Sequence, residues 1–180
     1  MNSNRNSRAK ADMGGGDGLS DLRLGAARRR LEESSSQSDA IEALREIVSN
    51  FLGSEEIALF EVDRKTADMR MLWSFGIDAE ECNPLRALHD VGLRRVTQGE
   101  CHVELPSDDS VGAAAKTQAF VPLRLANHTV AVLAILRLLP QKLGFDRPDM
   151  DLLRLLSEEA GKALFGSIAK PPTEEPEMRA

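Results

Sequence analysis

The side chains best suited to chemistry in this sequence are its two cysteines and three histidines. Cys82 and Cys101 are far enough apart, and few enough, that a reducing compartment should leave them as two free thiols rather than a disulfide framework. His89, His102 and His128 fall on a predicted helix, strand and turn, without a Cys or carboxylate at the spacing of a zinc site. The sequence therefore predicts no catalytic residues, no bound metal and no cofactor.

Two other motifs of catalytic proteins are also missing from the sequence. Residues 14–18 are rich in glycine, but no strand precedes them and no Lys-Ser or Lys-Thr pair follows, as a phosphate-binding loop requires. No nucleophile elbow occurs in the chain. We therefore expect a protein that is not an enzyme.

A candidate ligand pocket follows from side chains expected on the inward faces of the strands and on one neighbouring helix. Its predicted lining is Trp73, Phe75, Leu88, Cys101, Val103 and Phe120, and its candidate polar groups are Arg86, His89 and His102. Each of these residues also has an ordinary interpretation as core or as a solvated helix face. The aromatic content of 4% favours a filled, aliphatic interior, and a filled domain would act through protein contacts.

Composition limits the classes of protein that this chain can represent. At 180 residues it has room for one domain with a full core, and its net charge of −6 argues against a nucleic-acid surface. The longest apolar run, 130–136, is the length of a strand, and the basic N-terminus is not followed by the apolar stretch of a secretory signal. We expect a cytoplasmic protein without a transmembrane segment. The arginines at 28–30 are the exception, since they could contact an acidic partner or a membrane but are more simply solvated.

Hydrophobic periodicity predicts alternating helices and strands. A helix opens with a capping box of Asp39 and Glu42 and ends at Gly53, and a second runs from Asn83-Pro84 to Gly99. Asn127 is expected to take positive φ in a tight turn. In the strand predicted at 69–75, Met69, Met71, Trp73 and Phe75 should lie on one face. A loop is expected at 106–116 and a last helix at 146–165. The other strands are predicted at 57–62, 101–105, 119–125 and 129–138.

The two ends of the chain have little to bury. Residues 1–18 are polar and glycine-rich and are expected to be disordered, and so is the Pro/Glu-rich tail at 169–180. Between the first tail and the domain, residues 19–37 are predicted to form a short helix and a polar linker. The domain itself is expected at 38–168.

In this order, the elements and motifs resemble those of a GAF domain. The matching residues are Ala119-Phe120-Val121-Pro122-Leu123-Arg124, Val130 to Ile135, Phe145 with Asp149 and Leu152 to Leu156, and Thr97-Gln98-Gly99-Glu100. One departure is Ala131, where the family usually has Gly. The resemblance implies an α+β fold with a mostly antiparallel sheet of five or six strands. It places the first and last helices on one face and a helix and loop pocket on the other, in a bacterial signalling protein.

The resemblance also brings specific GAF activities to be weighed. The Asn-Lys-Phe-Asp-Glu motif of the cyclic-nucleotide class is absent from the sequence. Cys101-His102 resembles a bilin anchor but falls in a strand, where the family has a helix. Cys82 and Cys101 could supply the thiols of a free methionine sulfoxide reductase, although the sequence around them lacks that family's motifs. These three specific activities are less favoured than the two hypotheses of function that follow.

Two hypotheses of function remain open. The first is a signalling module that forms a homodimer or docks on a signalling protein through its terminal helices, with Leu44, Val48, Leu153 and Leu164 at the interface. The second is a small-molecule sensor, in which a ligand in the pocket orders the 106–118 loop and shifts the terminal helices. We favour the first, because the last helix has more apolar surface than one face can bury.

Overall fold

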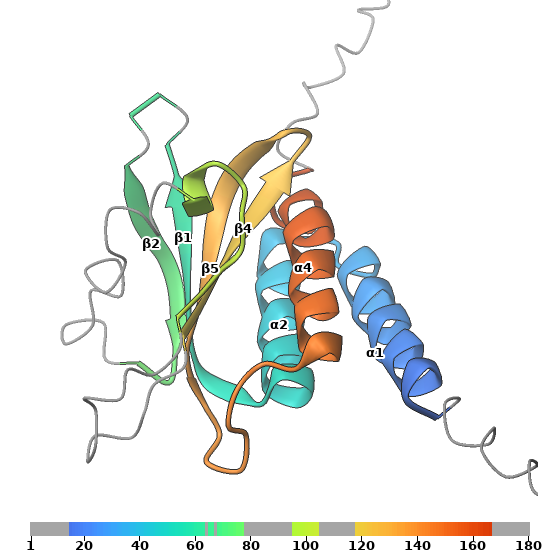
Figure 1. Cartoon of the computed structure of the whole chain (residues 1–180). Coiled ribbons are helices and arrows are strands. Elements are labelled where there is room, and N and C mark those ends of the chain that lie inside the picture. The colour runs from blue at the N-terminus through green and yellow to red at the C-terminus, as the bar shows by residue number, and fades with distance from the viewer. Residues whose placement is uncertain (1–14, 64, 67, 78–94, 105–117, 167–180) are drawn as a thin grey trace, which may run out of the picture.

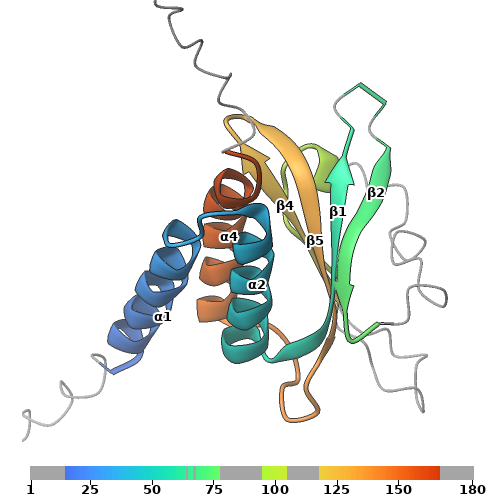
Figure 2. The ribbon, with the colours of Figure 1, turned by 180° about the vertical axis from the view of Figure 1, so that it is seen from behind.

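A computed structural model of the chain describes residues 15–63, 65–66, 68–77, 95–104 and 118–166. Five antiparallel strands form one sheet in the order β2-β1-β5-β4-β3. Helices α2 and α4 cover one face of this sheet, and α1 packs outside them (Figures 1 and 2). The bounds are α1 Gly15–Glu32, α2 Gln37–Ile47, η1 Val48–Leu52, β1 Ser54–Val62, β2 Met69–Phe75, β3 His102–Glu104, β4 Gln118–Leu125, β5 His128–Leu138 and α4 Arg147–Phe165.

Helix α2 begins earlier than the sequence pattern predicts. Its N-cap is Ser36, whose side chain accepts a hydrogen bond from the Asp39 backbone N–H, so the predicted Asp39 cap is wrong. Asp39 instead accepts the Ser35 hydroxyl at 2.6 Å. The helix continues as the π-helical turn η1 and ends at Gly53, which has a φ of 66° as predicted.

The β1–β2 hairpin forms where it was predicted, but its apolar residues do not share one face. Leu59 pairs with Trp73 and Phe60 pairs with Met71, which leaves Leu72 as an extra residue in β2. This bulge reverses the side-chain alternation. Met69 and Met71 therefore face away from the helices, whereas Trp73 packs on the helix side.

Two turns position the other strands. The predicted β4–β5 hairpin is present, but the residue with positive φ is Ala126, at 55°, and not Asn127. The helical turn before β3 ends at Gly99, with φ 91°, as predicted, and its backbone N–H donates to Val96 at 3.0 Å.

Helix α4 is held to β4 by two small residues. It starts where the sequence predicts, and Asp146 and Asp149 form a reciprocal capping box there. The buried Ser157 hydroxyl donates to the Pro122 carbonyl at 2.6 Å. A Cβ at Gly161 would lie 3.0 Å or less from three backbone atoms of Arg124, so glycine allows the helix to sit directly on the strand.

Helix α1 is part of the folded unit rather than a helix in a linker. Ala27 and Leu31 are buried in the same core as α2, α4 and the sheet. Residues 15–18, expected to be disordered, are helical. The remainder of the predicted N-terminal tail and the predicted tail at 169–180 lie outside the described residues.

Candidate functional site

The face of the sheet opposite the helices carries a second apolar cluster. It includes the fully buried Phe120 and Val96, with Met69, Met71 and Ile77 partly buried against it. Its other members are Ala58, Phe60, Val62, Val132, Ala134 and Leu136. The pocket predicted from the sequence was expected on this side of the sheet. If the pocket is present, its proposed lining residues should all lie on this face.

The aromatic residues of the predicted pocket are divided between the two faces. Trp73 packs against the helix-side core and stacks on Phe75, with ring centroids 6.3 Å apart. The Arg45 guanidinium of α2 lies 5.2 Å from the centre of the Phe75 ring. Phe120 lies on the opposite face, so these three side chains do not line one pocket. The bulge at Leu72 causes the separation, because it turns the second half of β2 toward the helices.

The Cys101-His102 pair is divided in the same way. Cys101 packs against the helix-side core together with Val103. His102 pairs with Phe120 across β3 and β4 and therefore lies on the second face. Burial raises the pKa of the Cys101 thiol, a shift that the nearby Arg124 and Arg154 only partly offset. A thiol of this kind is mainly protonated at neutral pH.

Several predicted residues cannot be placed relative to this face. Arg86, His89, Leu88 and Cys82 lie outside the described residues, and so does almost all of the 106–118 loop. Of the polar groups proposed for a ligand, the structure describes only His102.

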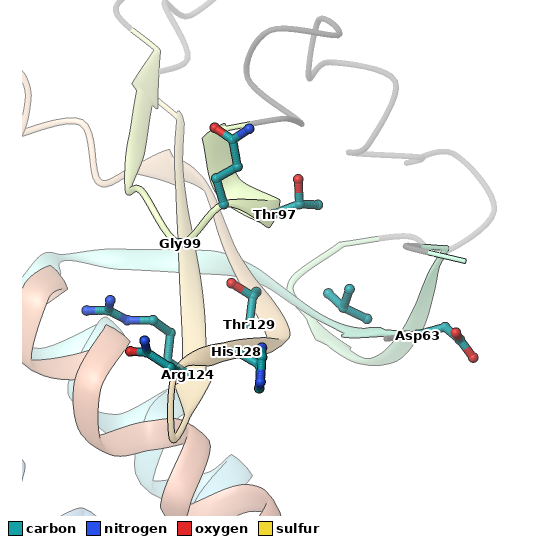
Figure 3. Close-up of a pocket in the computed structure, with 9 residues that line it drawn as sticks. Asp63, Thr97, Gly99, Arg124, His128 and Thr129 are labelled. Carbon is teal, nitrogen blue, oxygen red and sulfur yellow. The ribbon is translucent and has the colours of Figure 1, made fainter. Parts of the chain in front are cut away.

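An open, polar pocket of about 480 Å³ lies at the tips of the hairpins (Figure 3). Its labelled side chains come from the end of β1, the Gly99 turn and the β4–β5 hairpin. In Figure 3 the Asp63 carboxylate and the Arg124 guanidinium extend to opposite sides. The Thr129 hydroxyl donates to the Val96 carbonyl at 3.4 Å. The pocket can admit a small polar molecule, but its charged groups do not converge on one.

The four predicted interface residues, three leucines and a valine, are core residues. Leu44, Val48, Leu153 and Leu164 are each at most 2% exposed. They pack between α2, α4 and the sheet, because α1 covers the helix surface that the sequence pattern left without a partner. These residues cannot face another protein while the domain is folded, and the interface prediction is wrong for all four.

The charged cluster around Asp149 was not predicted. Asp149 is 1% exposed, and its carboxylate accepts hydrogen bonds from Arg23 at 3.0 Å and Lys142 at 2.6 Å. Arg23 also donates to the Phe51 carbonyl at 2.5 Å. The cluster joins α1, η1, the β5–α4 loop and the first turn of α4. The sequence predicted that the last helix starts at 146, but no local pattern links positions 23 and 149.

The electrostatics of this cluster favour the ionised carboxylate. Burial raises the pKa of Asp149, but hydrogen bonds from Lys142, the Asp146 backbone and Arg23 outweigh that effect and hold the pKa below its ordinary value. A second ion pair, Arg30–Glu46 at 2.6 Å, fastens the C-terminal end of α1 to α2. The inward side of α1 is thus attached at its middle and at its C-terminal end.

The described residues lack two features that would have indicated other functions. In this part of the chain, no group of three His, Cys, Asp or Glu side chains is arranged to hold a metal ion. Within the same residues, no helix combines the length and apolar character that a membrane crossing requires.

No protein-family model matches the sequence, and no curated protein matches it. Solved structures do resemble it. The GAF domain of a phosphoenolpyruvate-protein phosphotransferase from Acinetobacter has a TM-score of 0.62 and 16% identity, covering 84% of this chain and 96% of that one. A GAF domain/HD domain protein from Geobacter sulfurreducens has a TM-score of 0.56 and 14% identity, with 78% and 99% covered.

A third similar structure is the GAF domain of a putative sensor histidine kinase from Pseudomonas syringae pv. tomato. Its TM-score is 0.53 at 13% identity, with 84% of this chain and 89% of that chain covered. Identities this low are evidence of fold alone. They confirm the fold that the sequence motifs implied, an α+β domain with an antiparallel sheet of five strands in the described residues.

Proposed function

Because the chain has the fold of a GAF domain, we propose that it is a non-catalytic signalling module whose helical layer contacts a second copy or a signalling protein. The solved structures that resemble it include domains of a sensor histidine kinase and a methyl-accepting chemotaxis protein. We also propose that it acts in the cytoplasm, as its composition leads us to expect.

The observation that carries this proposal is the continuous connection from the sheet to α1. Ser157 and Gly161 seat α4 directly on β4, and Asp149 in the first turn of α4 binds Arg23 of α1. Because β4 also carries Phe120 on the opposite face, a shift of that face would move α4 and then α1. Contiguous networks of packed and hydrogen-bonded side chains can carry energetic coupling between two surfaces.

This chain of contacts reaches the outside of the molecule at the exposed surface of α1, where another protein could bind. Leu19 and Leu22 are 68% and 69% exposed, although α1 is buried along its opposite side. Two exposed leucines three positions apart on this helix offer apolar surface to which another protein can bind. The contact surface proposed here replaces the buried residues predicted from the sequence.

The second candidate function, a small-molecule sensor, is favoured by the composition of the second face. Met69 and Met71 are partly buried beside Phe60 and Phe120. Methionine side chains adapt to irregular ligands, so this surface could accommodate an apolar molecule. In this form the same connection through β4 and α4 would transmit the presence of the ligand.

The raised pKa of Cys101 supports a non-catalytic role. A free methionine sulfoxide reductase needs a thiolate nucleophile at neutral pH, and burial of Cys101 disfavours that form. We expect no turnover of free methionine sulfoxide above the rate of a Cys101→Ser variant.

Native mass spectrometry of the protein purified from its own host tests the proposal. A dimer, or a complex with a second protein, supports a module that acts by protein contact. An added small mass that disappears in a denaturing spectrum of the same sample supports the sensor instead. A bare monomer at all concentrations and in all preparations contradicts both.

A further inference from the structure

We propose that the groove between α1 and α4 receives α1 of a second copy of this chain, in an antiparallel arrangement with Asp21 opposite Arg28 of the second copy. The inference rests on the proposed function and deepens it, since it names a second copy as the partner and the groove side of α1, next to the side that carries Leu19 and Leu22, as the surface that this copy contacts. It is carried by the shape of the groove, by its charges and by the residues of α1 that have no role within the protomer.

The groove is a shallow, open depression between two helices. It has a volume of about 430 Å³ and lies between Asp21, Leu24, Gly25 and Arg28 of α1 and residues of α4. The α4 side is formed by Asp151, Arg154, Leu155 and Glu158. Leu24 and Leu155 supply apolar surface between charged rims, which is the pattern of a docking surface.

The charged residues of α1 divide into two sets. Arg23 and Arg30 point inward and bind Asp149 and Glu46. Asp21 and Arg28 are exposed and take part in no ion pair or side-chain hydrogen bond with the described part of the chain. They lie seven positions apart, which is two helical turns, so both fall on the side of α1 that borders the groove.

This pair of charges is complementary to itself. A two-fold axis between positions 24 and 25 brings Asp21 of each copy opposite Arg28 of the other, which forms two identical ion pairs. The same axis brings the two Leu24 side chains together. A parallel arrangement in register would instead place like charges opposite each other, so the charges select the antiparallel pairing.

Gly25 fits this arrangement and has no other evident use. A Cβ at Gly25 would meet no atom within 4 Å, and a glycine inside an exposed helix costs about 1 kcal/mol relative to alanine. Gly161, the glycine inside α4, is explained by its contact with β4. A second helix crossing at Gly25 would explain this residue in the same way.

Charge reversal tests the proposal on the full chain by sedimentation velocity. Asp21→Arg and Arg28→Asp each replace two attractive pairs by two repulsive ones, so each should raise the dimer dissociation constant at least about tenfold. An equimolar mixture of the two variants restores opposite charges at both positions and should form a heterodimer. The double variant D21R/R28D should form a homodimer.

Arg29→Asp is the matched control, because Arg29 is equally exposed but does not line the groove. It should dimerise like the wild type. Far-UV circular dichroism and thermal unfolding of each variant identify any loss of folding. If the single variants failed to dimerise because they were misfolded, mixing them would not restore dimerisation, since mixing changes neither chain.

The other outcomes overturn the inference. A wild type that is monomeric at 100 µM, about 100-fold above a micromolar dissociation constant, excludes this dimer, and the proposed function then depends on a different partner protein. A wild-type dimer that is unaffected by both reversals, or equally weakened by Arg29→Asp, means that copies associate through another surface. In that case the proposed signalling role is retained, but the groove between α1 and α4 is not the contact surface.

Discussion

Arg23 on α1 and Asp149 on α4 are 126 positions apart in the sequence and form a hydrogen-bonded ion pair of 3.0 Å. The carboxylate is buried and the guanidinium is partly exposed. Because Lys142 contacts the second carboxylate oxygen, the aspartate is held from both sides. This pair is the point at which the N-terminal helix is attached to the helix that lies on the sheet.

Replacing Arg23 should loosen α1 without unfolding the domain. Arg23→Ala removes bonds to Asp149 and to the Phe51 carbonyl, but Lys142 still neutralises the carboxylate. We expect a loss of about 1–2 kcal/mol in the free energy of unfolding, measured by urea denaturation. Hydrogen exchange should accelerate in residues 15–32 and remain slow in α4.

Arg29→Ala is the control for this prediction, because Arg29 is exposed on the same helix and has no ionic partner in the described residues. It should change stability by less than about 0.5 kcal/mol. Equal exchange rates for α1 in the two variants would show that the ion pair does not hold the helix in place.

The stabilisation from Asp149 should depend on pH below the ordinary Asp range. The pKa of Asp149 is depressed in the folded chain, so its contribution is complete above about pH 3.9, the pKa of an unperturbed Asp. It is lost as the pH falls through the lower folded pKa. Asp149→Asn should cost about 2–3 kcal/mol at pH 6.

The measurement is the difference in free energy of unfolding between wild type and Asp149→Asn from pH 6 to pH 2.5. The difference should shrink only below about pH 4. Asp151→Asn, which removes an exposed pair with Arg154, should show little difference at any pH. A constant difference for Asp149→Asn across the whole range would contradict an ionised, depressed carboxyl.

Gly161→Ala should separate α4 from β4. The added methyl would overlap the backbone of Arg124, which cannot move aside without disturbing the strand, so we expect a loss of about 2–4 kcal/mol. Gly18→Ala, where a Cβ would meet nothing within 4 Å, should be neutral or stabilising by up to about 1 kcal/mol. Equal urea midpoints for the two variants would mean that the helix is not seated on the strand.

Local patterns in the sequence predicted most of the elements, because caps, turns and alternation depend on residues close in the chain. The Gly53 and Gly99 ends and the start of the last helix at 146 were all predicted from such patterns. The sequence also predicted the GAF-like order of elements, which the structural comparisons confirm.

The assembly of the site could not be predicted in the same way. A single extra residue, Leu72, reverses the faces of β2 and moves Trp73 to the helix side, and nothing near it in the sequence marks the bulge. The predicted interface failed because burial of Leu44 and Leu153 depends on where α1 packs. That packing is fixed by contacts such as Arg23 to Asp149, which have no local sequence pattern.

The last prediction concerns the reactivity of Cys101. Burial raises the pKa of its thiol, so at pH 7.5 its thiolate fraction should be smaller than that of free cysteine, and alkylation by iodoacetamide should be slower. The measurement uses a Cys82→Ser background, so that only Cys101 reacts, with the urea-unfolded protein as control. The rate in the folded protein should rise with pH beyond the range in which free cysteine is already ionised. Fast alkylation at pH 6–7 would indicate a stabilised thiolate and would contradict the non-catalytic role.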